Sequence, residues 1–135
     1  MSVIGVLQLV REARNDKQRV LALERLQFFE MHKLLPKLYV EIMECMLEVC
    51  MPEAALSWFC SAQRHAVQLD VDMYMCAIVA YGRMRDASAA CRLLKDMQDN
   101  GVPGNTATYN AAISACAKAR QWKRALQVIR EMKGR

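Results

Sequence analysis

The sequence repeats itself at a spacing of 35 residues. Tyrosine recurs at three positions with this spacing, and so does alanine. We call a set of residues spaced 35 apart a column. Five columns are apolar or aromatic: Tyr39, Tyr74 and Tyr109; Ala55, Ala90 and Ala125; Leu56, Cys91 and Leu126; Phe59, Leu94 and Ile129; and Met43, Ile78 and Ile113. Columns in one register indicate a tandem repeat, in which no unit can bury its apolar face alone. The chain is therefore expected to fold as a stack of repeats.

The period divides the chain into four segments. Residues 36–70 and 71–105 are predicted to be complete repeats, and residues 106–135 a repeat truncated at its end. Residues 1–35 have the right length but match poorly, because Ile4 stands in the tyrosine column and Val20 in the alanine column. This first segment is predicted to be a degenerate or capping helical unit.

Each unit is predicted to contain two helices. In the last unit, apolar side chains recur twice at helical spacing, first in Tyr109, Ala112, Ile113, Cys116 and Ala117 and then in Trp122, Ala125, Leu126, Ile129 and Met132. In residues 71–105, Asp86 is well placed to cap the second helix, and Asn100-Gly101 to end it. The predicted fold class is all-α: an α-solenoid of stacked helix–turn–helix repeats.

The segment Thr108–Lys118, with the sequence TYNAAISACAK, resembles the first helix of a pentatricopeptide repeat. Residues 124–133, RALQVIREMK, are similar to the second helix of that motif. The resemblance extends over roughly 100 residues, and the tetratricopeptide repeat, with a period of about 34 residues, is the nearest alternative. The pentatricopeptide resemblance implies an α-solenoid that binds single-stranded RNA in mitochondria or plastids, with one unit for each base.

The resemblance also implies which side chains contact RNA. In the family, the residue after the tyrosine and the last residue of the unit contact the base edge. These positions make Asn110, Asn105 and Asp70 the candidate base contacts in this chain. Val40 and Met75, which follow the other two tyrosines, depart from the pattern because neither offers a useful hydrogen bond to a base.

A second family position, two residues before the tyrosine, usually holds an aliphatic side chain that sandwiches the base. Lys37, Asp72 and Ala107 occupy it here, and Asp72 would repel phosphate. Most of the side chains that contact bases in the family are therefore missing from this chain. One good base contact contributes only about 1–3 kcal/mol, so a single intact half-site could not specify a sequence alone.

The charge distribution favours the end of the chain as the RNA-binding part. The net charge is +5, and residues 118–135 contain seven Lys or Arg residues against Glu131 alone. Lys118 and Arg83 share a column where the family often has a lysine that contacts phosphate, so both are candidate phosphate contacts. Glu48 occupies the same column in residues 36–70. A basic helix face is also common on solvated surfaces that bind nothing.

The sequence predicts no catalytic residues, metal site or cofactor. It contains neither a G-x-x-x-x-G-K-[ST] loop nor a G-x-S-x-G motif. Its six cysteines form no C-x-x-C pair, and the apolar positions of Cys76, Cys91 and Cys116 predict reduced core cysteines. No apolar run is long enough to span a membrane. The chain is therefore expected not to be an enzyme.

Two functions fit these observations. The first is an organellar protein that binds single-stranded RNA, or a fragment of such a protein, acting in RNA processing or translation. The second is a helical scaffold subunit that has lost base readout, within a mitoribosome, a respiratory complex or a photosynthetic complex. Val40, Met75 and Asp72 favour the scaffold, whereas Thr108–Lys118 and the basic end favour RNA. The apolar residues of Gln121–Arg135 further predict an uncapped final helix, against which another repeat or a protein partner packs.

Overall fold

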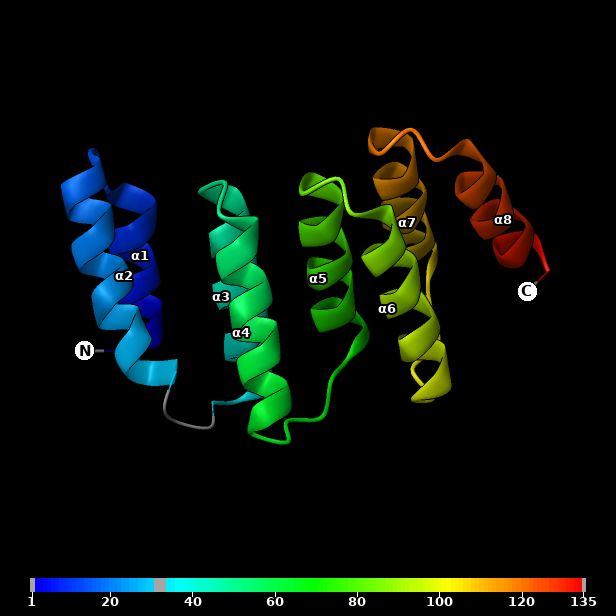
Figure 1. Cartoon of the computed structure of the whole chain (residues 1–135). Helices are drawn as coiled ribbons and strands as arrows, with labels where there is room; N and C mark the ends of the chain where they lie inside the picture. Colours follow the sequence, from blue (N-terminus) through cyan, green and yellow to red (C-terminus); the bar gives the residue numbers. More distant parts are fainter. Residues whose placement is uncertain (1, 31–33, 135) are drawn as a thin grey trace. The chain divides into compact units, whose positions relative to one another are not determined.

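The computed structural model describes residues 2–30 and 34–134, and these residues form eight α-helices and no strand (Figure 1). The helices come in pairs: α1 (Val3–Glu12) and α2 (Asp16–Glu30), α3 (Pro36–Glu48) and α4 (Pro52–Arg64), α5 (Val71–Arg83) and α6 (Ala87–Asp99), and α7 (Thr106–Lys118) and α8 (Trp122–Lys133). The helices α3, α5 and α7 begin 35 residues apart. The chain divides into two compact units, Met1–Leu69 and Asp70–Arg135.

Two kinds of residue begin the helices. Proline occupies the first turn of α3 and α4, at Pro36 and Pro52, where its missing N–H would have no helical partner. The side chains of Asp70, Asp86 and Asn105 cap α5, α6 and α7, each accepting a hydrogen bond from the backbone N–H three residues later. This geometry confirms the predicted cap at Asp86.

The turn inside each repeat contains a residue in the left-handed region of the backbone. Cys50, Arg85 and Arg120, again 35 residues apart, have φ angles of 60°, 58° and 58°. In each turn the following N–H bonds a carbonyl five residues earlier, from Met51 to Met46 at 2.8 Å, from Asp86 to Tyr81 at 2.9 Å and from Gln121 to Cys116 at 2.8 Å. This Schellman geometry closes α3, α5 and α7. Gly101, with φ 76°, follows the end of α6 as the sequence predicted.

Replacing Cys50 with glycine is expected to raise the free energy of unfolding by about 0.5–1 kcal/mol, because glycine adopts positive φ without strain. Cys60 provides a matched control, since it is also exposed but lies inside α4. There a glycine is expected to lower stability by about 1 kcal/mol. Urea unfolding followed by circular dichroism measures both changes. The same sign at both positions would contradict the backbone explanation.

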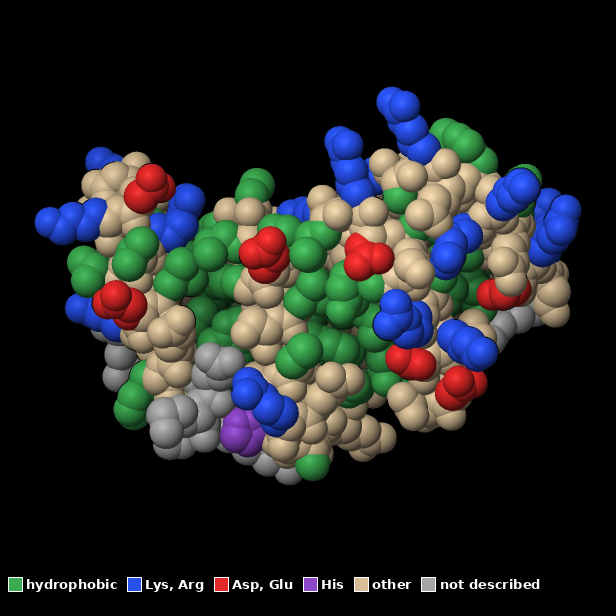
Figure 2. All heavy atoms as spheres, in the orientation of Figure 1, with side chains coloured by type: hydrophobic (Ala, Val, Ile, Leu, Met, Phe, Trp, Pro, Cys, Tyr) green, Lys and Arg blue, Asp and Glu red, His purple; other side chains and the backbone are tan. Residues whose placement is uncertain are grey.

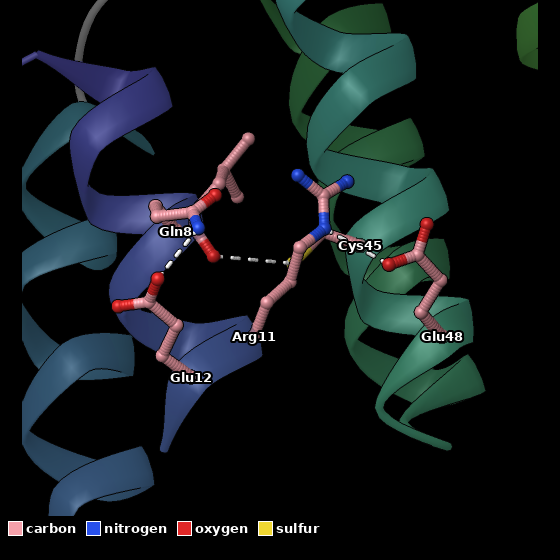
Figure 3. Close-up of polar contacts among 6 residues, drawn as sticks. Gln8, Arg11, Glu12, Cys45 and Glu48 are labelled. Carbon is pink, nitrogen blue, oxygen red and sulfur yellow. Dashed lines mark hydrogen bonds and ion pairs between the residues drawn. The ribbon is translucent and has the colours of Figure 1, made fainter.

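In the unit Met1–Leu69, α1 packs against α2 and α3, and α3 packs against α4. The buried Tyr39 of α3 contacts Trp58 of α4, with ring centroids 6.4 Å apart. Between α1 and α3, Arg11 Nε bonds Glu48 Oε2 at 2.9 Å, and the Cys45 thiol donates to a backbone carbonyl of α1 at 3.8 Å (Figure 3). The ion pair lies at the surface, so it contributes little to stability.

The predicted alignment of the first segment is wrong at Ile4 and Val20. Both side chains are exposed, by 58% and 52%, whereas the tyrosine and alanine columns are buried in the other repeats. The buried side chains of α1 instead match those of α3 at a spacing of 36 residues: Val3, Val6, Leu7 and Val10 correspond to Tyr39, Ile42, Met43 and Met46. The structure thus adds one residue to the period between the first two helix pairs.

This corrected register explains why the first segment resembles a repeat so poorly. It places Arg19 of α2 in the column that holds alanine in the other repeats. The Arg19 Nε atom is buried and has no hydrogen-bond partner among the described residues. In this register Val3 occupies the tyrosine column and Arg19 the alanine column, so neither recurring residue appears in the first segment.

In the unit Asp70–Arg135, α7 packs against α5, α6 and α8. Tyr74 and Tyr109 are each 2% exposed. The Tyr74 hydroxyl accepts a hydrogen bond from Asn100 Nδ2 at 3.0 Å, and the Tyr109 hydroxyl accepts one from Gln98 Nε2 at 2.8 Å. The second of these bonds joins α7 to α6 of the preceding repeat. The tyrosine hydroxyls therefore form hydrogen bonds both within a repeat, at Tyr74, and between neighbouring repeats, at Tyr109.

Candidate nucleic-acid interface

The helices α5 and α7 lie side by side and run in the same direction (Figure 1). Gly82 permits the close contact, because a Cβ atom at this position would lie 3.2 Å from the Cβ of Ala115. Each helix leaves one stripe of side chains exposed or half-exposed: Asp72, Met75, Val79 and Arg83 on α5, and Ala107, Asn110, Ser114 and Lys118 on α7. These α5 and α7 stripes match position by position at 35 residues.

The α7 stripe brings together two of the predicted RNA contacts. Asn110 and Lys118 are both exposed, and they lie eight residues apart on the same helix. At 1.5 Å per residue their backbone positions are about 12 Å apart along the helix axis. The stripe thus has an amide that can both donate and accept hydrogen bonds, and a cation further along. The α5 stripe has Met75 in place of the amide and begins with an acid at Asp72.

The other two predicted base contacts, Asp70 and Asn105, lie at the starts of α5 and α7, where they are exposed. Asp70 Oδ1 accepts a hydrogen bond from the Met73 N–H at 2.9 Å. Asn105 Oδ1 accepts one from the Thr108 N–H at 2.9 Å, and the Thr108 hydroxyl completes a capping box. Each cap therefore restricts what its side chain can offer a ligand. Asn105 keeps the two hydrogens of its amide NH2 group, whereas Asp70 remains an acceptor.

At the other end of α5 and α7, four cations form what we call the basic edge: Arg83, Arg85, Lys118 and Arg120. All four are exposed, and they occur as two pairs at the 35-residue spacing. Lys and Arg side chains project beyond these helix ends (Figure 2), where the α5–α6 and α7–α8 turns lie (Figure 1). The sequence pattern predicts Arg83 and Lys118 as phosphate contacts but not Arg85 and Arg120. The period, applied to the turn residues as well as the helices, would have found them.

The unit Met1–Leu69 lacks an equivalent cationic edge at the α3–α4 turn. Glu48 stands in the column of Arg83 and Lys118, and Cys50 in that of Arg85 and Arg120. Arg11 reaches Glu48 from α1, and this hydrogen bond raises the pKa of the Arg11 guanidinium. The half-buried Val40 adds no polar group in the position of Asn110. The α3–α4 pair therefore lacks the amide and the paired cations found on the helices of Asp70–Arg135.

Within residues 2–30 and 34–134, no three His, Cys, Asp or Glu side chains lie close enough to hold a metal ion. Of the helices described, none has both the length and the apolar character needed to cross a membrane.

Two sequence-family models match the repeats. The model of the PPR (pentatricopeptide) repeat family matches residues 69–118, and that of the PPR repeat matches residues 107–135. Residues 69–135 consist of pentatricopeptide repeats. Both α5 and α7, with their stripes and the basic edge, fall inside the matched residues. No curated protein matches this pentatricopeptide chain by sequence.

Solved structures confirm the predicted α-solenoid of helix–turn–helix repeats. Two crystal structures of the pentatricopeptide repeat protein PPR10, each in complex with an 18-nt psaJ RNA element, match with a TM-score of 0.73 and 20% sequence identity. One of them is of a variant with cysteine-to-serine substitutions. The match covers 98% of the present chain and 22% of PPR10, so the chain spans about a fifth of that protein's length.

Proposed function

We propose that this pentatricopeptide chain binds single-stranded RNA through α5 and α7, as part of an RNA-processing or translation factor in mitochondria or plastids. The observation that carries the proposal is the α7 stripe, where Asn110 and Lys118 are exposed on one helix beside the basic edge. The structural likeness to PPR10, whose structures contain RNA, supports the same class of ligand. Family membership supports the organellar location.

In the proposed complex the basic edge binds the phosphate backbone, and the polar side chains near the helix starts contact bases. Asn110 and Asn105 offer amide hydrogens to base acceptors, and Asp70 accepts from a base N–H. Met75 offers neither a hydrogen-bond donor nor a useful acceptor, so the repeat that contains α5 contributes less to base selection. The protein is expected to bind RNA with a strong electrostatic component and a narrow base preference centred on α7.

Salt-dependent binding of an unstructured RNA, measured by fluorescence anisotropy, tests the proposal. Four phosphate contacts predict that log K falls with log salt at a slope of about −3, since each contact to a single strand contributes about −0.7. Asn110→Ala is expected to reduce the difference in affinity between RNAs that vary at one base, because that contact is worth about 1–3 kcal/mol. Gln127→Ala, an exposed amide on α8, is the control and should leave base preference unchanged. Absence of binding at low salt would overturn the proposal.

The second candidate function is docking to a protein partner, and α8 supports it. Trp122 and Leu126 are 63% and 54% exposed, as expected of an uncapped helix, while Ile129 and Met132 are half-buried. In the preceding repeat the corresponding residues, Ala87 and Cys91, pack in a cluster with residues of α7 and α8. A scaffold role predicts that Trp122→Glu abolishes partner binding and leaves RNA affinity unchanged. RNA binding that depends on Asn110 would favour the first function.

A further inference from the structure

Two thiols meet where α6 of one repeat packs on α7 of the next. The sulfur atoms of Cys91 and Cys116 lie 3.6 Å apart. A disulfide bond is about 2.05 Å long, so the two atoms must approach by only about 1.5 Å to form one. Ala87 and Ala125 are buried in the same cluster, and such small neighbours oppose a slight shift of either helix less than bulky residues do.

The two thiols differ in their access to solvent. Cys116 is fully buried, whereas the half-buried Cys91 borders a groove of about 680 Å³ between α6 and α8. Three cations line this groove, Arg92, Lys95 and Arg124, against Asp99 and Glu131. A small anionic molecule can therefore reach Cys91 through the groove.

Protonation also separates the two thiols. Burial raises the pKa of Cys116 to about 12, and its hydrogen bond with Cys91 adds to the effect. Cys116 therefore remains a protonated thiol near neutral pH, and only the thiolate form attacks a disulfide. An exchange reaction is expected to begin at Cys91.

We propose that Cys91 and Cys116 form a disulfide-exchange site, where Cys91 reacts with a small anionic disulfide such as glutathione disulfide and Cys116 then completes a bond between α6 and α7. The Cys91 thiolate attacks one sulfur of the small disulfide, whose S–S bond breaks and releases one thiolate. The thiolate released in this first step takes the proton of Cys116, and the Cys116 sulfur then attacks the Cys91 sulfur of the mixed disulfide, which releases the second thiolate. The cysteines together lose two electrons and two protons, and the small disulfide becomes two thiols.

Peptide mapping of the full chain after incubation with oxidised glutathione tests the proposal. Remaining thiols are alkylated without reduction and the digest is analysed by mass spectrometry. We expect one cross-linked pair of peptides, containing Cys91 and Cys116, that lacks two hydrogen atoms. The exposed Cys50 and Cys60 act as internal controls, and each is expected to carry glutathione as a mixed disulfide. The cross-linked protein is expected to unfold at a temperature about 10 °C higher than the reduced protein.

A substitution traps the intermediate. In Cys116→Ala, glutathione should accumulate on Cys91, because no second thiol displaces it. In Cys91→Ala, Cys116 should stay alkylatable only after unfolding. Two results in the unsubstituted chain would overturn the proposal without reliance on either variant. One is glutathione that persists on Cys91, and the other is reaction at Cys50 and Cys60 while Cys91 and Cys116 remain thiols.

Discussion

Tyr74→Ala is expected to lower the free energy of unfolding by about 3–5 kcal/mol, as truncation of a large buried aromatic residue generally does. Tyr74 is 2% exposed and lies in the column that recurs in every repeat from Pro36 onward. Its loss leaves a cavity within the α5–α6 pair and removes the acceptor of the Asn100 amide. Since small domains are stable by only about 5–15 kcal/mol, a large part of the total stability depends on this ring.

Chemical denaturation measures this change in the free energy of unfolding. It is followed by circular dichroism at 222 nm, where α-helices give a negative band. Tyr74→Phe is the matched control, because it keeps the ring and removes only the hydroxyl. It is expected to cost about 1 kcal/mol, the usual value of one hydrogen bond. A loss as large for phenylalanine as for alanine would show that the hydroxyl, rather than ring packing, dominates at this position.

Replacing all four residues of the basic edge with glutamine is expected to weaken RNA binding by roughly 10²–10³-fold at about 0.1 M salt. For each cation replaced, RNA binding releases about 0.7 fewer counterions from a single strand. The slope of log K against log salt should therefore become less steep by about 3. Anisotropy titrations at several salt concentrations give both quantities.

The chain provides a control of equal charge within the same unit. Lys123, Arg124, Arg130 and Lys133 are four exposed cations of α8, away from the α5 and α7 stripes. Their replacement by glutamine changes the net charge by the same amount, so it tests whether position matters. We expect a much smaller loss of affinity. An equal loss in both variants would contradict binding along α5 and α7 and indicate attraction to overall charge alone.

Much of the fold follows from the period, because buried columns recur wherever one helix pair packs on the next. The period could not align the first segment, since α1 and α3 match at 36 residues and Arg19 occupies the alanine column. The exposed turn cations Arg85 and Arg120 were missed for a different reason. Recurring apolar residues mark the core, whereas these side chains are exposed. The contact between the Cys91 and Cys116 thiols could not be predicted from the sequence either, because it depends on how α6 packs against α7.

The caps at Asp70 and Asn105 limit how such a repeat can change its preference for a base. Each side chain must accept a hydrogen bond from its own helix start before it can contact a ligand. Only a few short polar residues, chiefly aspartate, asparagine, serine and threonine, do this well. A substitution that suited a new base but could not cap the helix would cost about 1 kcal/mol of stability. In the proposed RNA complex, the residues allowed at this position are therefore limited by helix capping as well as by contact with a base.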